Sequence, residues 1–439
     1  MFNFYSCLLK NIVLPIADRV MHTNVSSFYH EIKKMQSYSN DEIAEWQFVN
    51  LKKLLNHAYN NTNYYRKIFN QANLLPRDIT GIQDLNKLPI LTKDDIKKNF
   101  NDIVPGNISS IIHKKSFTGG SSGVPLTLLL DNKSWSYAVA NKIFNWEKIG
   151  YKYGEKHIAL GSTSLLVNKN KSFKHLFYYI LKRKIGLNGI NMSNDVCFEY
   201  INFIKKRKIR YIYGYASSIF LLAKYLLNTG CRIDIKACFS TSEILTNEYR
   251  NTIYDAFKCK IMDCYGAHDG GITAFEYKND FFEVGYNSVL LLENNFKKSS
   301  PVLLTDLFNY AMPLINYKLG DEVEMDYNKN LKYDYNGQII DKILGRTSDV
   351  IYLENGRNLT GPGFTVLFKN LPVEYYYIKK NGINSVECSI VKAIDYNEKY
   401  ETLIIDTFKK QIGSDATISI NYINEPVLAD SGKRKYFDS

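Results

Sequence analysis

The chain has 439 residues, a formal net charge of +12, and 45% hydrophobic against 23% charged residues, which is the balance of a globular protein long enough to bury a sizeable core. Domains usually contain ~100–200 residues, so two or three folding units are expected. The charge would suit nucleic acid, an anionic membrane or phosphate ligands, but the lysines are spread along the chain and no recognition-helix, zinc-finger or RNP-type signature is present, so no nucleic-acid partner is expected.

The N-terminal segment, residues 1–20, is apolar in patches that Lys10, Pro15 and Asp18 interrupt. No other stretch approaches the ~20 apolar residues that a membrane-spanning helix needs. We therefore expect no transmembrane segment. The N-terminal segment is predicted to form a helix that packs on the protein body or touches a membrane surface, which leaves peripheral membrane contact open.

Helical and strand patterns alternate from residue 41 onward. Apolar residues recur at helical spacing within 41–72, and a second helix is predicted to begin at Thr92, a good N-cap with acidic residues in the next turn. Residues 108–131 predict a strand, a Gly/Ser-rich loop and another strand. A long helix is expected from about Ser134 to Glu147.

Four short apolar runs are then bounded by turns and helices, as buried parallel strands are. They lie near residues 157–162, 210–213, 236–239 and 259–264. The segment SSIFLLAKYLLNTG predicts a helix with Gly230 at its C-cap. The first ~280 residues therefore alternate between β and α, which predicts an α/β layered fold.

After residue 280 the pattern changes to a meander of strands, and a boundary is expected at 345–350. The predicted fold class is α/β, with a large N-terminal domain of layered β-sheets and helices and a small, mobile α+β C-terminal domain. The first domain, residues 1–345, is expected to bind ATP and the acid discussed below. The second, residues 346–439, contains the runs VECSIVKAI and TISINYI, which resemble strands.

The seven cysteines are odd in number, and no two have CxxC spacing. This favours reduced thiols in a cytoplasmic protein over a disulfide framework. A zinc site is not expected either, because spaced cysteine pairs and an HxxxH pattern are absent.

The first segment that suggests chemistry is the loop SFTGGSSGVP, residues 116–125. Its three glycines allow tight turns and close approach to a ligand, and its hydroxyl and backbone N–H groups suit phosphate oxygens. It is not a Walker loop, and although it satisfies GxSxG, the expected strand after Pro125 argues against a hydrolase elbow. A plain Gly/Ser hairpin loop is the alternative interpretation.

The second segment is YGAHDGG, residues 265–271, directly after a predicted strand. Ligands bind at the carboxyl ends of strands in open α/β sheets, so an aromatic ring and a carboxylate here suit a base and Mg²⁺. The alternative is an ordinary turn between a strand and a helix. His268 is more simply a satisfied polar residue than a catalyst.

Three further segments follow in order. Asp306 and Asp321 would suit ribose hydroxyls if they lie at turns, although aspartate is also common in plain β-turns. The run GRTSD contains Arg346, whose guanidinium suits phosphate or ribose. Near the C-terminus Lys433 follows Gly432 and could present a mobile charge, or the segment could be a frayed basic tail.

The order of these five segments resembles that of the adenylate-forming superfamily of acyl- and aryl-CoA synthetases. The match is closest to the phenylacetate–coenzyme A ligase-like branch that includes CapK-type capsule biosynthesis proteins. That branch has runs similar to LLNHAYNNTNYYRKIF, KLPILTKDDI, GYASSIFLLAKYL and TDLFNYAMPLINYKLGD in this chain. The resemblance covers roughly residues 40 to 436.

The resemblance implies roles for particular residues. Tyr265 and Gly266 would flank the adenine, as would Ser242 and Glu243. Asp321 would bind the ribose hydroxyls. The loop residues that would bind the ATP β- and γ-phosphates are Thr118, Gly119, Gly120, Ser121, Ser122 and Gly123.

Three more residues are implied as catalytic. Asp269 would hold Mg²⁺ with ATP, and Arg346 would bind ribose or phosphate. Lys433 would bridge the acyl carboxylate and the α-phosphate. Segments 214–218 and 240–245 are expected to line the acid pocket, and Tyr215, Ala216 and Phe239 suggest that the lining is apolar or aromatic.

This sequence departs from the family pattern at three positions. Asp269 stands where glutamate is usual, Lys318 where many members have arginine, and Ser348 where the hinge residue is often Asp or Lys. Some relatives have a Cys/His metal site after the YG segment. Here Tyr277 and Glu283 occupy that neighbourhood, so no such metal is predicted.

The expected activity is that of an AMP-forming ligase. A carboxylic acid is activated with ATP and Mg²⁺ as an acyl-adenylate, then transferred to CoA, a carrier-protein thiol, or an amine such as an amino sugar or amino acid, with a possible place in capsule polysaccharide biosynthesis. A non-catalytic adenylate-binding or scaffold protein of the same fold is the first alternative. A basic nucleic-acid or membrane-surface protein is the second.

Overall fold

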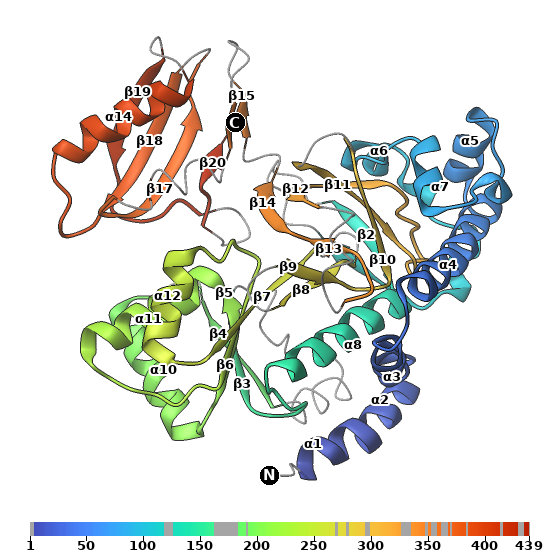
Figure 1. Cartoon of the computed structure of the whole chain (residues 1–439), viewed down its shortest axis with the longest axis horizontal. Coiled ribbons are helices and arrows are strands. Elements are labelled where there is room, and N and C mark those ends of the chain that lie inside the picture. Colours follow the sequence, from blue (N-terminus) through green and yellow to red (C-terminus); the bar gives the residue numbers. More distant parts are fainter. Residues whose placement is uncertain are drawn as a thin grey trace. The chain divides into compact units, whose positions relative to one another are not determined.

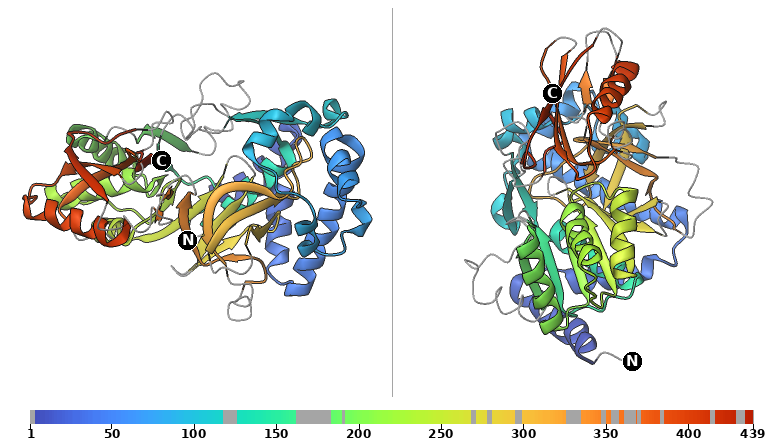
Figure 2. Two further views of the ribbon diagram at one scale, coloured as in Figure 1. Left: turned by 90° about the horizontal axis from the view of Figure 1, so that it is seen from above. Right: turned by 90° about the vertical axis from the view of Figure 1, so that its left-hand side faces the viewer.

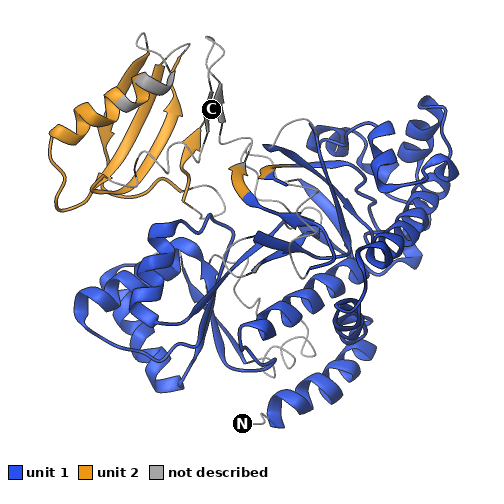
Figure 3. Ribbon diagram, in the orientation of Figure 1, with its two compact units in different colours: residues 1–118, 125–319, 324–342 blue, residues 119–124, 320–323, 343–439 orange. Residues whose placement is uncertain are grey.

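A computed structural model covers the whole chain and describes all residues except 1–3, 118–125, 162–182, 190–191, 268–270, 278–280, 295–298, 326–334, 347–349, 353–357, 361–367, 369–370, 383–384, 413–415, 429–433 and 439. The chain divides into two compact units (Figure 3). Unit 1 comprises residues 1–118, 125–319 and 324–342, and unit 2 comprises 119–124, 320–323 and 343–439.

The described helices alternate with strands through most of unit 1 (Figure 1). The helices are α1 (Phe4–Leu8), the π-helical turn η1 (Leu9–Val13), α2 (Leu14–Met21), α3 (Val25–Met35), α4 (Asn40–Asn61), α5 (Asn63–Gln71), the 3₁₀ turns η2 (Pro76–Asp78), η3 (Ile82–Lys87) and η4 (Ile108–Ser110), α6 (Lys93–Lys98), α7 (Phe100–Ile103), α8 (Asn132–Lys148), α10 (Asn194–Arg207), α11 (Ala216–Thr229), α12 (Asn247–Phe257) and α14 (Lys399–Ile412).

In the described part of the chain, the strands form five sheets. They are β1 (His113–Phe117), β2 (Thr127–Asp131), β3 (His157–Gly161), β4 (Lys184–Asn188), β5 (Tyr211–Tyr215), β6 (Ala237–Thr241), β7 (Lys260–Gly266), β8 (Thr273–Tyr277), β9 (Phe281–Val284), β10 (Ser288–Leu292), β11 (Ser299–Asp306), β12 (Tyr317–Glu324), β13 (Ile339–Ile340), β14 (Lys342–Arg346), β15 (Val350–Tyr352), β16 (Asn358–Thr360), β17 (Val373–Lys380), β18 (Ser385–Lys392), β19 (Thr417–Tyr422) and β20 (Phe437–Asp438).

The eight-stranded sheet of unit 1 has the strand order β13-β9-β8-β7-β6-β5-β3-β4. Strands β4, β3, β5, β6 and β7 are parallel, and β8, β9 and β13 continue the sheet in antiparallel pairs. Helices α10, α11 and α12 lie together on one side of the strands (Figures 1 and 2). Helix α8 lies on the opposite side, so both faces of the parallel part are covered.

Local signals in the sequence explain several element boundaries. The Thr92 hydroxyl accepts from the Asp95 backbone N–H at 3.1 Å while the Asp95 carboxylate accepts from the Thr92 N–H at 2.9 Å, which closes a capping box at the start of α6. Helix α11 ends at Gly230, whose φ of +67° is the left-handed conformation that glycine adopts readily. Both boundaries were predicted.

Two predictions need correction. The helix expected over residues 41–72 is two helices, because Thr62 is extended and its hydroxyl accepts from the Tyr65 N–H at 3.2 Å, starting α5 anew. The alternation of strand and helix expected to ~280 ends earlier. Strand β7 is followed by antiparallel β8 and β9 instead of a helix, since buried aromatic residues such as Phe281 favour a strand.

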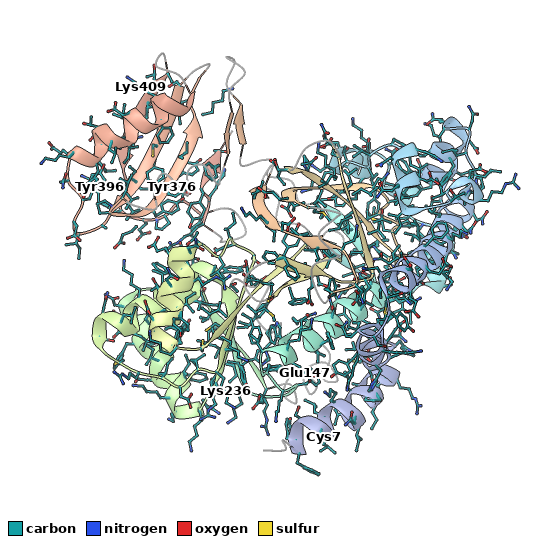
Figure 4. All side chains as sticks on the ribbon, in the orientation of Figure 1. Cys7, Glu147, Lys236, Tyr376, Tyr396 and Lys409 are labelled. Atoms are coloured by element: carbon teal, nitrogen blue, oxygen red, sulfur yellow. The ribbon has the colours of Figure 1, made fainter. Side chains whose placement is uncertain are left out.

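Unit 2 contains a four-stranded sheet in the order β19-β18-β17-β20 and the helix α14. Nine buried residues form its core, among them Ile378, Cys388, Ile404 and Phe408. Figure 4 shows Tyr376 on β17 and Tyr396 after β18. The predicted α/β class with a small α+β region near the C-terminus is confirmed, and the division of domains at 345/346 stays a prediction.

Candidate functional site

The carboxyl ends of three neighbouring parallel strands bring the predicted binding segments together. Tyr215 ends β5 opposite Thr241, which ends β6, and Thr241 in turn lies opposite Cys264 in β7. Ser242 and Glu243 directly follow β6. Because parallel strands end at one edge of the sheet, the 215–218, 242–243 and 265–266 segments all lie along that edge.

Glu243 has a structural partner at this edge. Its Oε2 accepts a hydrogen bond of 2.8 Å from the backbone N–H of Ser217 in the first turn of α11. A carboxylate at this position satisfies one of the unpaired N–H groups of the helix and complements the positive end of its dipole. Ser242 is exposed and has a φ of +69°, a sparsely populated conformation for a residue other than glycine. The hydrogen bond from Ser217 to Glu243 therefore links the turn after β6 to the start of α11 and stabilises its conformation.

Tyr265 and Gly266 are the last two residues of β7 and pair with Ala274 and Thr273 of β8. The sequence predicted them in a turn after the strand, and the structure corrects this placement. Tyr265 keeps partial exposure and Gly266 is exposed. A partly exposed aromatic side chain at the strand edge can stack on a purine.

Asp321 lies inside strand β12, whereas the sequence placed it at a turn. The residue before it, Gly320, has a φ of +89°, which only glycine adopts without strain. Lys318, which stands where many relatives have arginine, forms an ion pair of 2.8 Å with Glu293. Lys318 on β12 therefore has a structural partner of its own, directly after β10.

Several predicted site residues lie outside the described residues. These are Thr118, Gly119, Gly120, Ser121, Ser122, Gly123, Asp269 and Lys433, and also His268 and Ser348. The Gly/Ser loop is bracketed by the antiparallel pair β1 and β2, with Phe117 opposite Thr127, so the strand that follows the loop is confirmed. Arg346 is the last residue of β14, and its side chain is not described.

Asp306 is a buried structural residue. Its Oδ2 accepts from the Ser134 hydroxyl at 2.5 Å, and its Oδ1 accepts from the Phe308 N–H at 3.1 Å. Burial raises the pKa of this carboxyl to about 7. A Cβ on Gly271 would lie only 2.4 Å from Asp306 Oδ2, so the glycine after the 268–270 segment packs directly on this carboxyl. Of the two interpretations of Asp306, the structure supports the turn aspartate.

The α8 face of the sheet holds a cluster that the sequence analysis did not identify. Trp146 stacks on Phe239, with ring centroids 4.0 Å apart and planes at 19°, and its ring also meets Tyr213 at 5.1 Å. The ammonium of Lys142 lies 5.4 Å from the ring centroids of both Trp146 and Tyr213. The signal in the sequence that could have identified this cluster is the spacing of Lys142 and Trp146, because residues four apart lie on the same face of a helix.

The residues expected to line the acid pocket are buried. Tyr215, Ala216 and Phe239 are each no more than 2% exposed. Phe239 belongs to the aromatic cluster under α8, and Tyr215 packs against Ala159 of β3. The apolar and aromatic character expected of this region is present, but these side chains belong to the packed interior.

On the opposite face, an acidic pair is held by hydrogen bonds. Asp263 of β7 accepts from the Ser240 hydroxyl at 2.7 Å, and its backbone N–H donates to Glu276 at 3.0 Å. Arg250 of α12 forms an ion pair of 2.6 Å with Glu276. Burial raises the pKa of Asp263 to about 6. Every member has a partner, so this cluster is a structural link between α12 and the sheet.

Glu283, at one of the positions where some relatives have a metal ligand, forms an ion pair with Lys148 of α8. At the same end of α8, Glu147 accepts hydrogen bonds from Lys10 at 3.0 Å and from the Tyr29 hydroxyl at 2.6 Å. Figure 4 shows Glu147 on the side of α8 that faces the N-terminal helices. These pairs fasten α8 to the strands and to the N-terminal segment.

The fold is that of adenylate-forming acyl-CoA ligases. A 2-hydroxyisobutyryl-CoA ligase in the postadenylation state, in complex with R3-HIB-AMP, superposes with a TM-score of 0.70 at 13% identity and covers 92% of each chain. The amide bond synthetase McbA from Marinactinospora thermotolerans superposes with a TM-score of 0.51 at 12% identity, over 73% of this chain and 66% of that chain. No protein-family model matches the chain.

Two curated relatives indicate which adenylate-forming proteins the chain resembles in sequence. Protein CapK of Staphylococcus aureus is 22% identical over 99% of this chain and 98% of its own length. A phenylacetate–coenzyme A ligase of Pseudomonas putida is 29% identical over 88% of this chain and 92% of its own. The chain is similar to CapK over nearly its whole length and to a phenylacetate–coenzyme A ligase over most of it, which confirms the resemblance to this branch predicted from its motifs.

Proposed function

We propose that the chain activates a carboxylic acid with ATP as an acyl-adenylate and transfers the acyl group to coenzyme A. The observation that carries the proposal is the convergence of Ser242, Glu243 and Tyr265 at one carboxyl edge of a sheet in this fold. The named activity of the phenylacetate–coenzyme A ligase relatives, and the acyl-AMP and CoA complexes of the structural neighbours, support the same chemistry.

The chemistry explains why such a site needs few acid–base groups. A carboxylate is a poor electrophile because oxide is a poor leaving group. Attack of the carboxylate oxygen on the α-phosphorus of ATP forms the acyl-adenylate and releases pyrophosphate, and AMP then leaves when the acceptor attacks the acyl carbon. Positioning and charge stabilisation supply most of the catalysis in such phosphoryl chemistry.

In this proposal the partly exposed Tyr265 stacks on the adenine, and the turn at Ser242 and Glu243, fixed by its bond to Ser217, borders the base. Asp321 binds the ribose. Arg346 binds ribose or phosphate, and Thr118, Gly119, Gly120, Ser121, Ser122 and Gly123 bind the β- and γ-phosphates.

Asp269 is proposed to hold Mg²⁺, which would neutralise phosphate charge. Lys433, in the proposed C-terminal domain 346–439, bridges the carboxylate and the α-phosphate, and mobility of that domain would let one site serve both steps. Carboxylate oxygens are the ligands that Mg²⁺ prefers.

Coenzyme A is the acceptor that the named relatives favour. A carrier-protein thiol, or an amine such as an amino sugar or amino acid, is the second candidate, because an amide bond synthetase shares the fold over 73% of the chain. The match to CapK along the whole chain supports a place in capsule polysaccharide biosynthesis. The seven free thiols suit a reducing, cytoplasmic setting.

The N-terminal helices support the proposal of peripheral membrane contact. None of the helices in the described residues combines the length and apolar character needed to cross a bilayer. The apolar side chains spaced four residues apart along α1, η1 and α2 are nevertheless 37% to 73% exposed, namely Phe4, Leu8, Ile12, Ile16 and Val20. The one acidic residue in 4–21, Asp18, is buried, which suits an anionic lipid surface.

This contact is tested by sedimentation with vesicles of anionic or zwitterionic lipid. The wild-type protein should sediment with the anionic vesicles, and Ile12→Asp with Ile16→Asp should abolish this. Equal sedimentation of the variant, or none of the wild type, would refute the contact.

The proposed activity is tested by incubating the protein with ATP, Mg²⁺ and a panel of aryl, fatty, hydroxy and amino acids, with and without coenzyme A. The account expects acid-dependent AMP and pyrophosphate, and an acyl thioester when coenzyme A is present. ATP binding with no AMP from any acid would favour a non-catalytic adenylate-binding protein. Salt-sensitive polyanion binding with no ATP effect would favour a basic surface protein.

A further inference from the structure

Two hydrogen-bond donors on the α8 face have only a thiol acceptor beside them among the described residues. The indole Nε1 of Trp146 is buried, and the acceptor nearest to it in the described part of the structure is the Cys264 thiol. The Lys142 ammonium contacts the Trp146 and Tyr213 rings, and among the described residues no carboxylate lies within ion-pair distance of it. An unpaired buried donor is costly, so two side by side need an explanation.

The surroundings of Lys142 make its charge expensive. Burial lowers the pKa of this ammonium from its usual value, although the side chain as a whole keeps some exposure. The polar neighbour that partly offsets this is the Cys264 thiol, and burial raises the pKa of that thiol so that it is neutral. A neutral thiol is only a weak acceptor and cannot satisfy either donor fully.

The position of the donors relates them to the candidate site. Cys264 pairs with Thr241, the last residue of β6, and the hydroxyl of Tyr213 hydrogen-bonds to Thr241. Lys142 therefore lies on the α8 face near the strand ends that carry Ser242 and Tyr265, whereas the Trp146 ring reaches along the sheet to His157, the first residue of β3.

The other lysines of α8 show that this arrangement is particular to Lys142. Lys148 has the carboxylate of Glu283. Lys133 lies over the rings of Phe308 and Tyr310, at 4.8 and 5.7 Å, but the Asp131 carboxylate is near enough to favour its charge. Lys142 has aromatic neighbours of the same kind but, in the part of the chain that the structure describes, no carboxylate within ion-pair distance.

We propose that Lys142 and Trp146 bind a second anionic group on the substrate acid, so that the acid is a dicarboxylate or a similarly charged acid. This inference rests on the proposed function. A second carboxylate would accept from both the ammonium and the indole N–H and would give Lys142 an ion pair that none of the described residues provides. A plain aryl or fatty acid would leave both donors unsatisfied.

The test compares matched mono- and dicarboxylic acids, such as butyrate with succinate and benzoate with isophthalate, by acid-dependent ATP–pyrophosphate exchange. The wild type should prefer the dicarboxylate of a pair. Lys142→Met should lower kcat/KM for the dicarboxylate by roughly 10- to 100-fold while retaining activity on the monocarboxylate. Lys133→Met, the matched control on the same helix, should keep the wild-type preference.

A binding measurement separates failure of this inference from failure of the proposed function. Dicarboxylates, added without ATP, should raise the Tm of the wild type and of Lys133→Met but not of Lys142→Met. If no acid supports exchange but this shift is present, the proposed function fails and the anion site stands. The inference is overturned if the wild type prefers monocarboxylates. It is also overturned if Lys142→Met keeps the wild-type preference for dicarboxylates and the wild-type Tm shifts.

Discussion

The two faces of the eight-stranded sheet are built from the same strands but differ in chemistry. On the α10–α12 face, alternate residues such as Ile212 and Cys238 join a closed aliphatic core with buried residues of all three helices. On the α8 face, the next residues along the two strands are Tyr213 and Phe239. Both rings pack against Trp146, and the Lys142 ammonium lies over the Tyr213 ring. The alternation of side chains along each strand produces both environments.

The comparison shows where the protein keeps unsatisfied polar groups. The polar members of the α10–α12 face, Asp263, Glu276 and Arg250, are paired with one another or with Ser240. On the α8 face, among the described residues, the indole N–H of Trp146 has only the Cys264 thiol beside it and Lys142 has no carboxylate within ion-pair distance. We infer that the first face supplies stability and that the second, with the carboxyl edge, supplies recognition.

The largest effect is expected at the residue assigned to the chemistry itself. Lys433→Ala should slow adenylation by roughly 100- to 1,000-fold, because a charge aimed at the reacting phosphate is lost. The rate of AMP formation measures this. Lys435→Ala is the control, since Lys435 already pairs with Asp438 at 2.8 Å and should be dispensable for adenylation. Equal rates for Lys433→Ala and wild type would refute the assignment.

The aliphatic face should respond in stability and not in specificity. Leu222→Ala, at a fully buried position in α11, should lower the free energy of unfolding by about 2–5 kcal/mol. Its preference among acids should stay that of the wild type. Leu227→Ala on the same helix is the control, because Leu227 is 47% exposed and should cost little. A change of acid preference in Leu222→Ala would contradict the assignment of stability to the α10–α12 face and of recognition to the α8 face.

Asp306 should make stability depend on pH. The pKa of its carboxyl is raised in the folded protein to about 7 from an ordinary value of 3.8, so folding favours the protonated form. The associated stability is complete below pH 3.8 and is lost as pH rises through about 7. Asp306→Asn should flatten this decline in chemical denaturation between pH 4 and 8.

The exposed Asp94→Asn serves as the control for that experiment and should keep the wild-type slope. Parallel curves for wild type and Asp306→Asn would show that the Asp306 carboxyl does not titrate as described.

The smallest effect is expected at the carboxyl edge. Glu243→Ala removes the acceptor for the Ser217 N–H at the start of α11 and should cost about 1 kcal/mol of stability. Glu243→Gln keeps an acceptor without the charge and should recover part of that loss. Thermal unfolding measures both. No change in Tm for Glu243→Ala would mean that the turn after β6 is held by other contacts.

Local signals in the sequence predicted much of the fold. The Thr92 capping box, the Gly230 C-cap and the buried runs that became β3, β5, β6 and β7 depend on neighbouring residues alone. The break at Thr62 and the antiparallel strands after β7 were missed, because tertiary packing decides them. The family resemblance was predicted from the order of motifs and is confirmed.

The candidate site was only partly predictable. Placement of Glu243 and Tyr265 at the strand ends follows from strand position, but the bond from Ser217 to Glu243 joins residues 26 apart in the chain and could not be inferred. In the sequence, nothing distinguishes Lys142 from a surface lysine of an amphipathic helix. Its environment is set by Tyr213 and Cys264, which come from two other strands.

The central claim, that this chain forms acyl-adenylates, is tested most directly by ATP–pyrophosphate exchange of the full chain against the acid panel. The account predicts exchange that depends on Mg²⁺ and on one class of acid, and that is lost in Lys433→Ala. Measurable ATP binding with no acid-dependent exchange for any class would contradict it.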